Sequence, residues 1–142
     1  MSKHIRTATI YIIAALASGV FYREFTKFSK FDGITTLSSV HPHLFLLGGV
    51  LFLVIGLFSG ILSFESDKRF RWFRRLYHIG LPLTAIMMVV RGIVEVKAIP
   101  LSRGLHAAIS GMAGIGHIIV TIAIFLLLAA LHTAAKRKEN AA

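Results

Sequence analysis

Residues 41–64 read HPHLFLLGGVLFLVIGLFSGILSF, a stretch of 24 residues without a charged side chain. A helix needs about 20 mostly apolar residues to cross the hydrocarbon layer of a membrane, which is roughly 30 Å thick. Backbone groups find no water to bond inside lipid, so a segment that crosses it must be helical. The stretch therefore predicts a transmembrane helix over about residues 41–64.

Three further apolar blocks of similar length lie on either side of this stretch, at about residues 7–25, 76–96 and 105–132. Hydrophobic residues make up 56% of the chain, more than in an ordinary soluble domain. The first block also resembles a signal peptide, because Ala15-Leu16-Ala17 follows a basic start, but we expect it to remain as a helix. The sequence thus predicts an all-α, integral membrane bundle of four transmembrane helices, forming one domain over residues 1–142.

The amino-acid composition excludes several classes of function. The chain has no cysteine, so it offers no disulfide, thiolate zinc site, iron–sulfur cluster or thiol nucleophile. Its net charge of +10 would suggest nucleic acid on a soluble protein, but here the basic residues sit at the ends of the apolar blocks. We therefore expect the lipid bilayer as the partner, and no nucleic acid.

The basic residues also predict the orientation of the helices. One side of the membrane would carry ten Lys and Arg, from both termini and the loop before residue 76, and the other side five. Cytoplasmic loops are the ones enriched in Lys and Arg, so both termini are expected in the cytoplasm. Four aromatic residues just before and at the start of the third block are predicted to form an interfacial belt on the same side: Phe70, Trp72, Phe73 and Tyr77.

Function must then lie between the helices, where ionisable side chains are costly and usually mark a site. The chain has seven histidines. His4 is set aside because it lies in the N-terminal tail, and His78 and His132 are interpreted as interfacial residues. The remaining candidates are His41, His43, His106 and His117, with Arg91 and Glu95.

Histidines on facing helices can hold a heme iron between two imidazoles, provided that the porphyrin has a slot. Counting from the outer helix ends places His41 and His43 at the depth of His106, and His117 three helical turns deeper, by about 16 Å. Small residues surround His117 on its helix: Ser110, Gly111, Ala113, Gly114, Gly116 and Thr121. They are compatible with close helix packing and with a cofactor slot.

Arg91 and Glu95 are four residues apart on the third predicted helix. One interpretation is an ion pair within the helix that neutralises both side chains. The other is that the Arg91 guanidinium receives a heme propionate, since its planar fork suits a carboxylate.

Several stretches also carry a family resemblance. His41-Pro42-His43-Leu44, running into Gly48-Gly49, is similar to the H-x-H helix of the heme–copper oxidase catalytic subunit. Residues 19–28, 41–48, 87–96 and 110–118 together resemble a small bacterial family of four-helix membrane proteins grouped with the heme–copper-oxidase-like proteins. The resemblance implies a bacterial inner membrane location, with His41, His43 and His117 as heme ligands. It offers no counterpart for His106.

Depth thus pairs His41 or His43 with His106, whereas the resemblance pairs the H-x-H histidines with His117. An earlier start of the second helix, near Thr36 or Ser38, would lower His43 toward His117, and we give this pair a slight preference. A heme shared between subunits would also relax the depth constraint. Several faces of small residues make a homo-oligomer plausible.

We predict a b-type heme protein that transfers electrons or binds a diatomic gas (NO or O2), with a redox partner not identified and enzymatic activity left open. Two alternatives remain. The first alternative is a membrane protein that binds copper or zinc through His41, His43 and His106, since imidazole suits both metals. In the second the chain is a small transporter or assembly partner without a cofactor.

Overall fold

The computed structural model describes residues 1–141, and this part of the chain is all-α. Four of its helical rods are long and apolar enough to cross a membrane, as the sequence predicts. The second rod is continuous but contains a π-helical segment, so it is written as three elements. The elements in chain order are α1 (Ser2–Phe28), α2 (Leu37–His43), η1 (Leu44–Val50), α3 (Leu51–Ser59), α4 (Lys68–Val96) and α5 (Arg103–Glu139).

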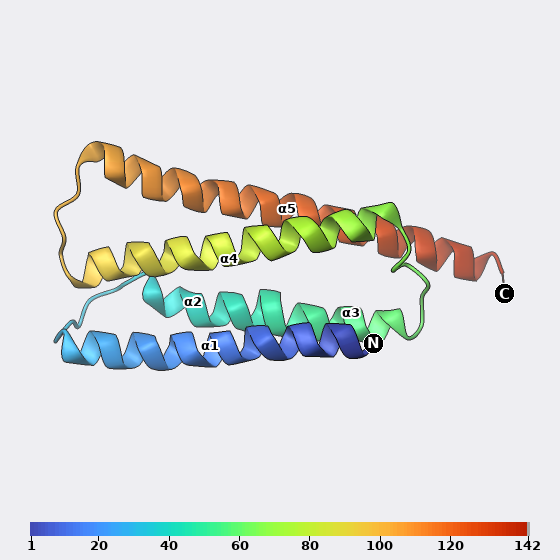
Figure 1. Ribbon diagram of the computed structural model, residues 1–142, viewed down its shortest axis with the longest axis horizontal. Helices are drawn as coiled ribbons and strands as arrows, with labels where there is room; N and C mark the ends of the chain where they lie inside the picture. Colours follow the sequence, from blue (N-terminus) through green and yellow to red (C-terminus); the bar gives the residue numbers. More distant parts are fainter. Residues whose placement is uncertain (142) are drawn as a thin grey trace.

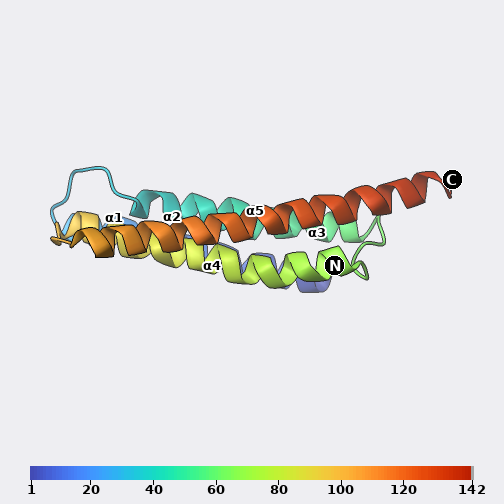
Figure 2. The same ribbon diagram turned by 90° about the horizontal axis from the view of Figure 1, so that it is seen from above.

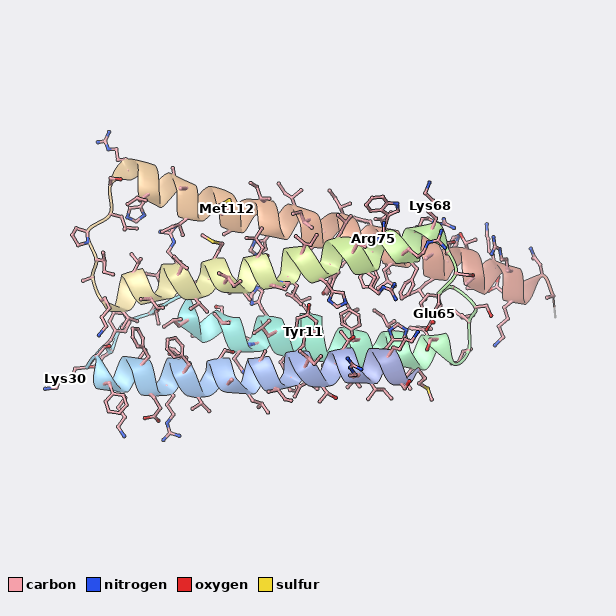
Figure 3. All side chains as sticks on the ribbon, viewed as in Figure 1. Tyr11, Lys30, Glu65, Lys68, Arg75 and Met112 are labelled. Carbon is pink, nitrogen blue, oxygen red and sulfur yellow. The ribbon has the colours of Figure 1, made fainter. Side chains whose placement is uncertain are left out.

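The rods form two antiparallel hairpins that lie side by side (Figures 1 and 2). In one hairpin α1 packs along α2, η1 and α3, and in the other α4 packs along α5. Both chain ends and the 60–67 loop lie at one end of the bundle, and the 29–36 and 97–102 loops lie at the other. Figure 3 shows Glu65, Lys68 and Arg75 toward the first of these ends and Lys30 at the second. The termini therefore share one end, and which side of a membrane this end faces stays a prediction.

The first, third and fourth rods extend beyond their predicted boundaries, whereas the second rod begins earlier than predicted and ends at Ser59 rather than near residue 64. The third rod begins at Lys68 rather than near residue 76, since the carboxylate of Asp67 accepts a hydrogen bond from the Arg69 backbone N–H at 2.8 Å. A carboxylate in this position stabilises the first helical turn. The C-terminal ends of α1 and α4 resemble each other, because each is followed by a residue in the left-handed region: Lys30 after α1 and Ala98 after α4, both at φ 49°.

The predicted interfacial belt is wrong for three of its four residues. Phe70, Phe73 and Tyr77 are buried, with at most 2% of their surface exposed, whereas Trp72 is 46% exposed. Positions three and four residues apart share one face of a helix, and on α4 this face points into the bundle. Phe52 of α3 and Tyr11 of α1 continue the same aromatic core.

Glycines allow the second rod to approach its neighbours closely. A Cβ on Gly48 would collide with Tyr11 of α1, and one on Gly49 would lie 2.6 Å from Ile12. On α4, a Cβ on Gly92 would lie 2.6 Å from the backbone nitrogen of Leu37. The start of α2 is therefore seated directly on the backbone of α4.

Candidate functional site

A cavity of about 500 Å³ lies between α2, α4 and α5, toward the end of the bundle that carries the 29–36 and 97–102 loops. Its volume is in the range of small-molecule and cofactor pockets, about 300–1,000 Å³. A second cavity of about 320 Å³ adjoins it along the second rod and shares Ser39 and His43 with it. The larger cavity is lined by residues 34–36, 38, 39, 43, 87, 88, 91, 109, 110, 113 and 117.

The start of α2 determines the depth of His43. α2 begins at Leu37, four residues before the predicted boundary. Glu95 of α4 holds this start, because its carboxylate accepts hydrogen bonds from the Thr36 backbone N–H at 2.6 Å and the Thr36 hydroxyl at 2.9 Å. A carboxylate at a helix N-terminus satisfies free N–H groups and favours the helix dipole. His43 consequently lies about one turn deeper than in a helix that begins at residue 41.

A π-helical segment follows His43 directly. η1 runs from Leu44 to Val50, after Pro42 has removed one backbone donor from the preceding turn. The hydroxyl of Tyr77 donates to the carbonyl oxygen of Leu47 at 2.9 Å. Such segments are rare and are often found at functional sites.

The structure brings His43 and His117 together. Their ring centroids are 6.4 Å apart, and the ring planes are nearly perpendicular, at 86°. Both rings line the larger cavity. His43 is half-buried and His117 is exposed on the surface of α5.

Hydrogen bonds define the tautomer of both imidazoles. His43 Nδ1 lies 2.7 Å from the carbonyl oxygen of Ser39, and His117 Nδ1 lies 2.8 Å from that of Ala113. A carbonyl oxygen only accepts, so each Nδ1 is the donor and carries the hydrogen. In a neutral imidazole Nε2 then keeps a free lone pair, which is the usual state of a histidine that ligates a metal.

His106 has the opposite arrangement. Arg91 donates to His106 Nδ1 at 3.1 Å and to the hydroxyl of Ser110 at 2.5 Å. A guanidinium has no acceptor, so Nδ1 of His106 accepts and the hydrogen of the neutral ring lies on Nε2. His106 therefore supports Arg91 rather than offering a lone pair to the cavity.

Arg91 is not paired with Glu95. Among the described residues 1–141 no ion pair includes Arg91, and both Glu95 oxygens accept from Thr36. The ion pair within α4, one of the two interpretations of this spacing, is thus not formed. Arg91 lines the cavity with its charge unmatched by any carboxylate of the described chain.

The two histidines of the H-x-H motif face different neighbours. His41 Nδ1 lies 2.9 Å from the carbonyl oxygen of Ala15 in α1, and His41 does not line the larger cavity. Residues 1–141 contain no group of three histidine or acidic residues that could hold a metal ion. The convergence of His41, His43 and His106, which the copper or zinc alternative requires, is therefore not present in this part of the chain.

The small residues around His117 divide into two sets. A Cβ added to Gly111 or Gly114 would meet nothing within 4 Å, so neither glycine is needed for packing inside the chain. A Cβ on Gly116 would lie 2.5 Å from the hydroxyl of Thr84. Gly116 thus serves the contact between α5 and α4 and does not widen the cavity.

Two histidines have contacts that the sequence did not reveal. His4 lies in α1, is 6% exposed, and its Nε2 donates to the carboxylate of Glu65 at 2.6 Å, which lowers the pKa of Glu65. His78 stacks on Tyr11, and its Nδ1 lies 3.1 Å from the Tyr11 hydroxyl. The helical period of α1 was the available signal, since His4 shares a face with Ala8, Tyr11 and Ala15.

A family model, described as protein of unknown function (DUF2871), matches residues 1–134. The chain belongs to this family. No curated protein and no solved structure matches it. The family match covers the first three rods, α5 as far as residue 134 and every residue that lines the cavity, and it carries no link to the heme–copper oxidases.

Proposed function

We propose that this family member is a b-type heme protein of the membrane, in which His43 and His117 would hold the heme iron. The observation that carries the proposal is the 6.4 Å separation of their rings. Two imidazoles on opposite sides of one metal ion, with metal–nitrogen bonds of about 2 Å, have their centroids about 6 Å apart. The separation of the two rings is therefore compatible with an iron atom held between them.

The hydrogen bonds of the two rings support the same assignment. Ser39 and Ala113 hold the Nδ1 hydrogens, which leaves both Nε2 lone pairs for the metal. The chain has no cysteine to compete as a heme ligand. His106, whose Nδ1 is occupied by Arg91, becomes a supporting residue in this proposal.

Arg91 supports the assignment through its charge. A guanidinium among apolar helices needs an anion, and its present partners His106 and Ser110 are neutral acceptors. A heme propionate directed toward the 29–36 loop would supply that anion and accept from the guanidinium fork. Arg91 would then set the direction of the heme in its slot.

Ligation by two imidazoles favours electron transfer as the role of the heme. Two histidines that hold the iron together would leave no free position on it for a diatomic gas. The iron would supply one-electron chemistry, and the protein would supply the ligands, the propionate contact and an apolar surrounding. We place the protein in a bacterial inner membrane, with both termini in the cytoplasm and a second copy covering the exposed side of His117.

The test is the visible spectrum of the protein purified in detergent and loaded with heme. The parent chain should show a six-coordinate, low-spin Soret spectrum. His43→Ala and His117→Ala should each lose it, while His132→Ala, an exposed histidine near the far end of α5, should leave it unchanged. A chain that takes up no heme, or a low-spin spectrum that survives either of the first two substitutions, would overturn the proposal.

A further inference from the structure

A groove of about 460 Å³ lies at the opposite end of the bundle, between the 60–67 loop and the last turns of α5. Its walls differ in chemistry. Ile61, Leu62 and Ala134 form an apolar side, and Ser63, Ser66, Arg137 and Lys138 form a polar and basic side. The groove shares no residue with the histidine cavity.

The basic side of the groove has no acidic partner in the described chain. Among residues 1–141, neither Arg137 nor Lys138 belongs to an ion pair. Asp67 is engaged with Arg69 at 2.8 Å and Glu65 with His4 at 2.6 Å, while Glu139, which follows Lys138 on α5, forms no ion pair within residues 1–141. The groove therefore presents two exposed positive charges that no carboxylate of the described residues pairs with.

The apolar side continues beyond the charged one. An adjoining groove of about 390 Å³ shares Ile61, Leu62 and Lys138 with the first and adds Phe58 and Ala135, with Glu139 at its rim. A molecule that fills both grooves must combine a negatively charged group with a long apolar part. A free inorganic anion would leave the apolar walls uncovered.

In a bundle that spans a bilayer, the groove would lie near the lipid headgroups. α5 has 37 residues and is about 55 Å long, against a hydrocarbon layer of roughly 30 Å. Its last turns project beyond the other rods (Figure 1). Basic pockets between helices at this level bind the head groups of anionic lipids.

We propose that this groove is a binding site for an anionic glycerophospholipid, independent of the heme assignment. Arg137 and Lys138 bind the phosphodiester, Ser63 and Ser66 donate hydroxyl hydrogen bonds to it, and the acyl chains lie along Ile61 and Leu62. A zwitterionic lipid is disfavoured because its headgroup cation would lie beside the same two basic side chains.

The experiment is native mass spectrometry of the full chain in detergent, titrated with phosphatidylglycerol or phosphatidylcholine. The parent should bind one phosphatidylglycerol tightly and phosphatidylcholine weakly. The double variant Arg137→Gln, Lys138→Gln should bind phosphatidylglycerol roughly thirtyfold more weakly, from two basic contacts of about tenfold or less each. The matched control Lys3→Gln, Arg6→Gln removes the same charge from exposed residues at the same end, outside the groove, and should bind as the parent does.

Three results would overturn this site. The first is equal phosphatidylglycerol affinity in the double variant and the parent, and the second is equal affinity of the parent for the two lipids. The third is displacement of phosphatidylglycerol by millimolar inorganic phosphate, which would show that the acyl chains contribute nothing. Circular dichroism of both double variants verifies that the helices are retained.

Discussion

Arg91 and Glu95 are one helical turn apart on α4, yet the structure gives them separate tasks, and two substitutions distinguish those tasks. Glu95→Gln replaces a carboxylate that accepts two hydrogen bonds from Thr36 with an amide that has one acceptor oxygen. Arg91→Gln removes a charge whose described partners are His106 and Ser110.

The expected magnitudes follow from these bonds. A hydrogen bond to a charged group contributes about 1.5–3 kcal/mol and a neutral one about 0.5–1.5 kcal/mol, so Glu95→Gln should cost about 2–3 kcal/mol of stability. Arg91→Gln should change the stability of the heme-free protein by about 1 kcal/mol or less, because the charge it removes is itself costly among apolar helices. If Arg91 binds a propionate, the same substitution should weaken heme retention about tenfold to a hundredfold.

The assay is heme content per protein and the rate of heme loss to a scavenger, measured beside thermal unfolding of the heme-free protein. Arg91→Lys is the matched control, since it keeps the charge and loses the bidentate fork, and its heme retention should be intermediate. Equal heme retention in Arg91→Gln and the parent would refute the propionate contact. A Glu95→Gln protein as stable as the parent would refute the role of Glu95 at the start of α2.

Three further predictions address packing, pH and orientation. Gly116→Ala should destabilise the bundle by about 1–3 kcal/mol because its Cβ meets Thr84. Gly114→Ala faces open space and should be neutral or stabilising by up to about 1 kcal/mol. Equal melting temperatures of the two variants would contradict the contact between Gly116 and Thr84. Hydrogen bonds from the side chain and backbone of Arg69 lower the pKa of Asp67 to about 2, so its stabilisation of α4 is complete above about pH 4 and is lost as the pH falls through 2. Asp67→Ala should therefore cost about 1 kcal/mol at pH 7, with the difference from the parent vanishing near pH 2 in denaturant titrations; a constant difference would argue against the charged cap. Reporter fusions after the C-terminus and after Lys30 should report the cytoplasm and the opposite side respectively, and the reverse pattern would refute the orientation taken from the basic residues.

The four rods were predictable from the sequence because the apolar blocks are long and backbone groups inside lipid have only helical partners. The boundaries were less predictable. α4 begins at an aspartate cap and α5 continues into a basic tail, and neither feature carries a hydropathy signal. The aromatic residues near the start of α4 show the same difficulty, since Trp72 and Phe73 are adjacent in sequence but Trp72 is 46% exposed and Phe73 is fully buried.

The candidate histidines were also visible in the sequence, because imidazoles among apolar residues are rare and costly. Their pairing was only partly predictable, because depth favoured His106 and the family resemblance favoured His117 as the partner of His43. The pairing depends on Glu95 and Gly92, which seat the start of α2 on α4 and so lower His43 by one turn, and on Arg91, which occupies Nδ1 of His106. The sequence alone determined four apolar helices and a set of polar side chains between them, since both follow from local composition. Only the tertiary structure decided that His43 meets His117, because this contact depends on the relative depth of two helices held by residues far apart in the chain.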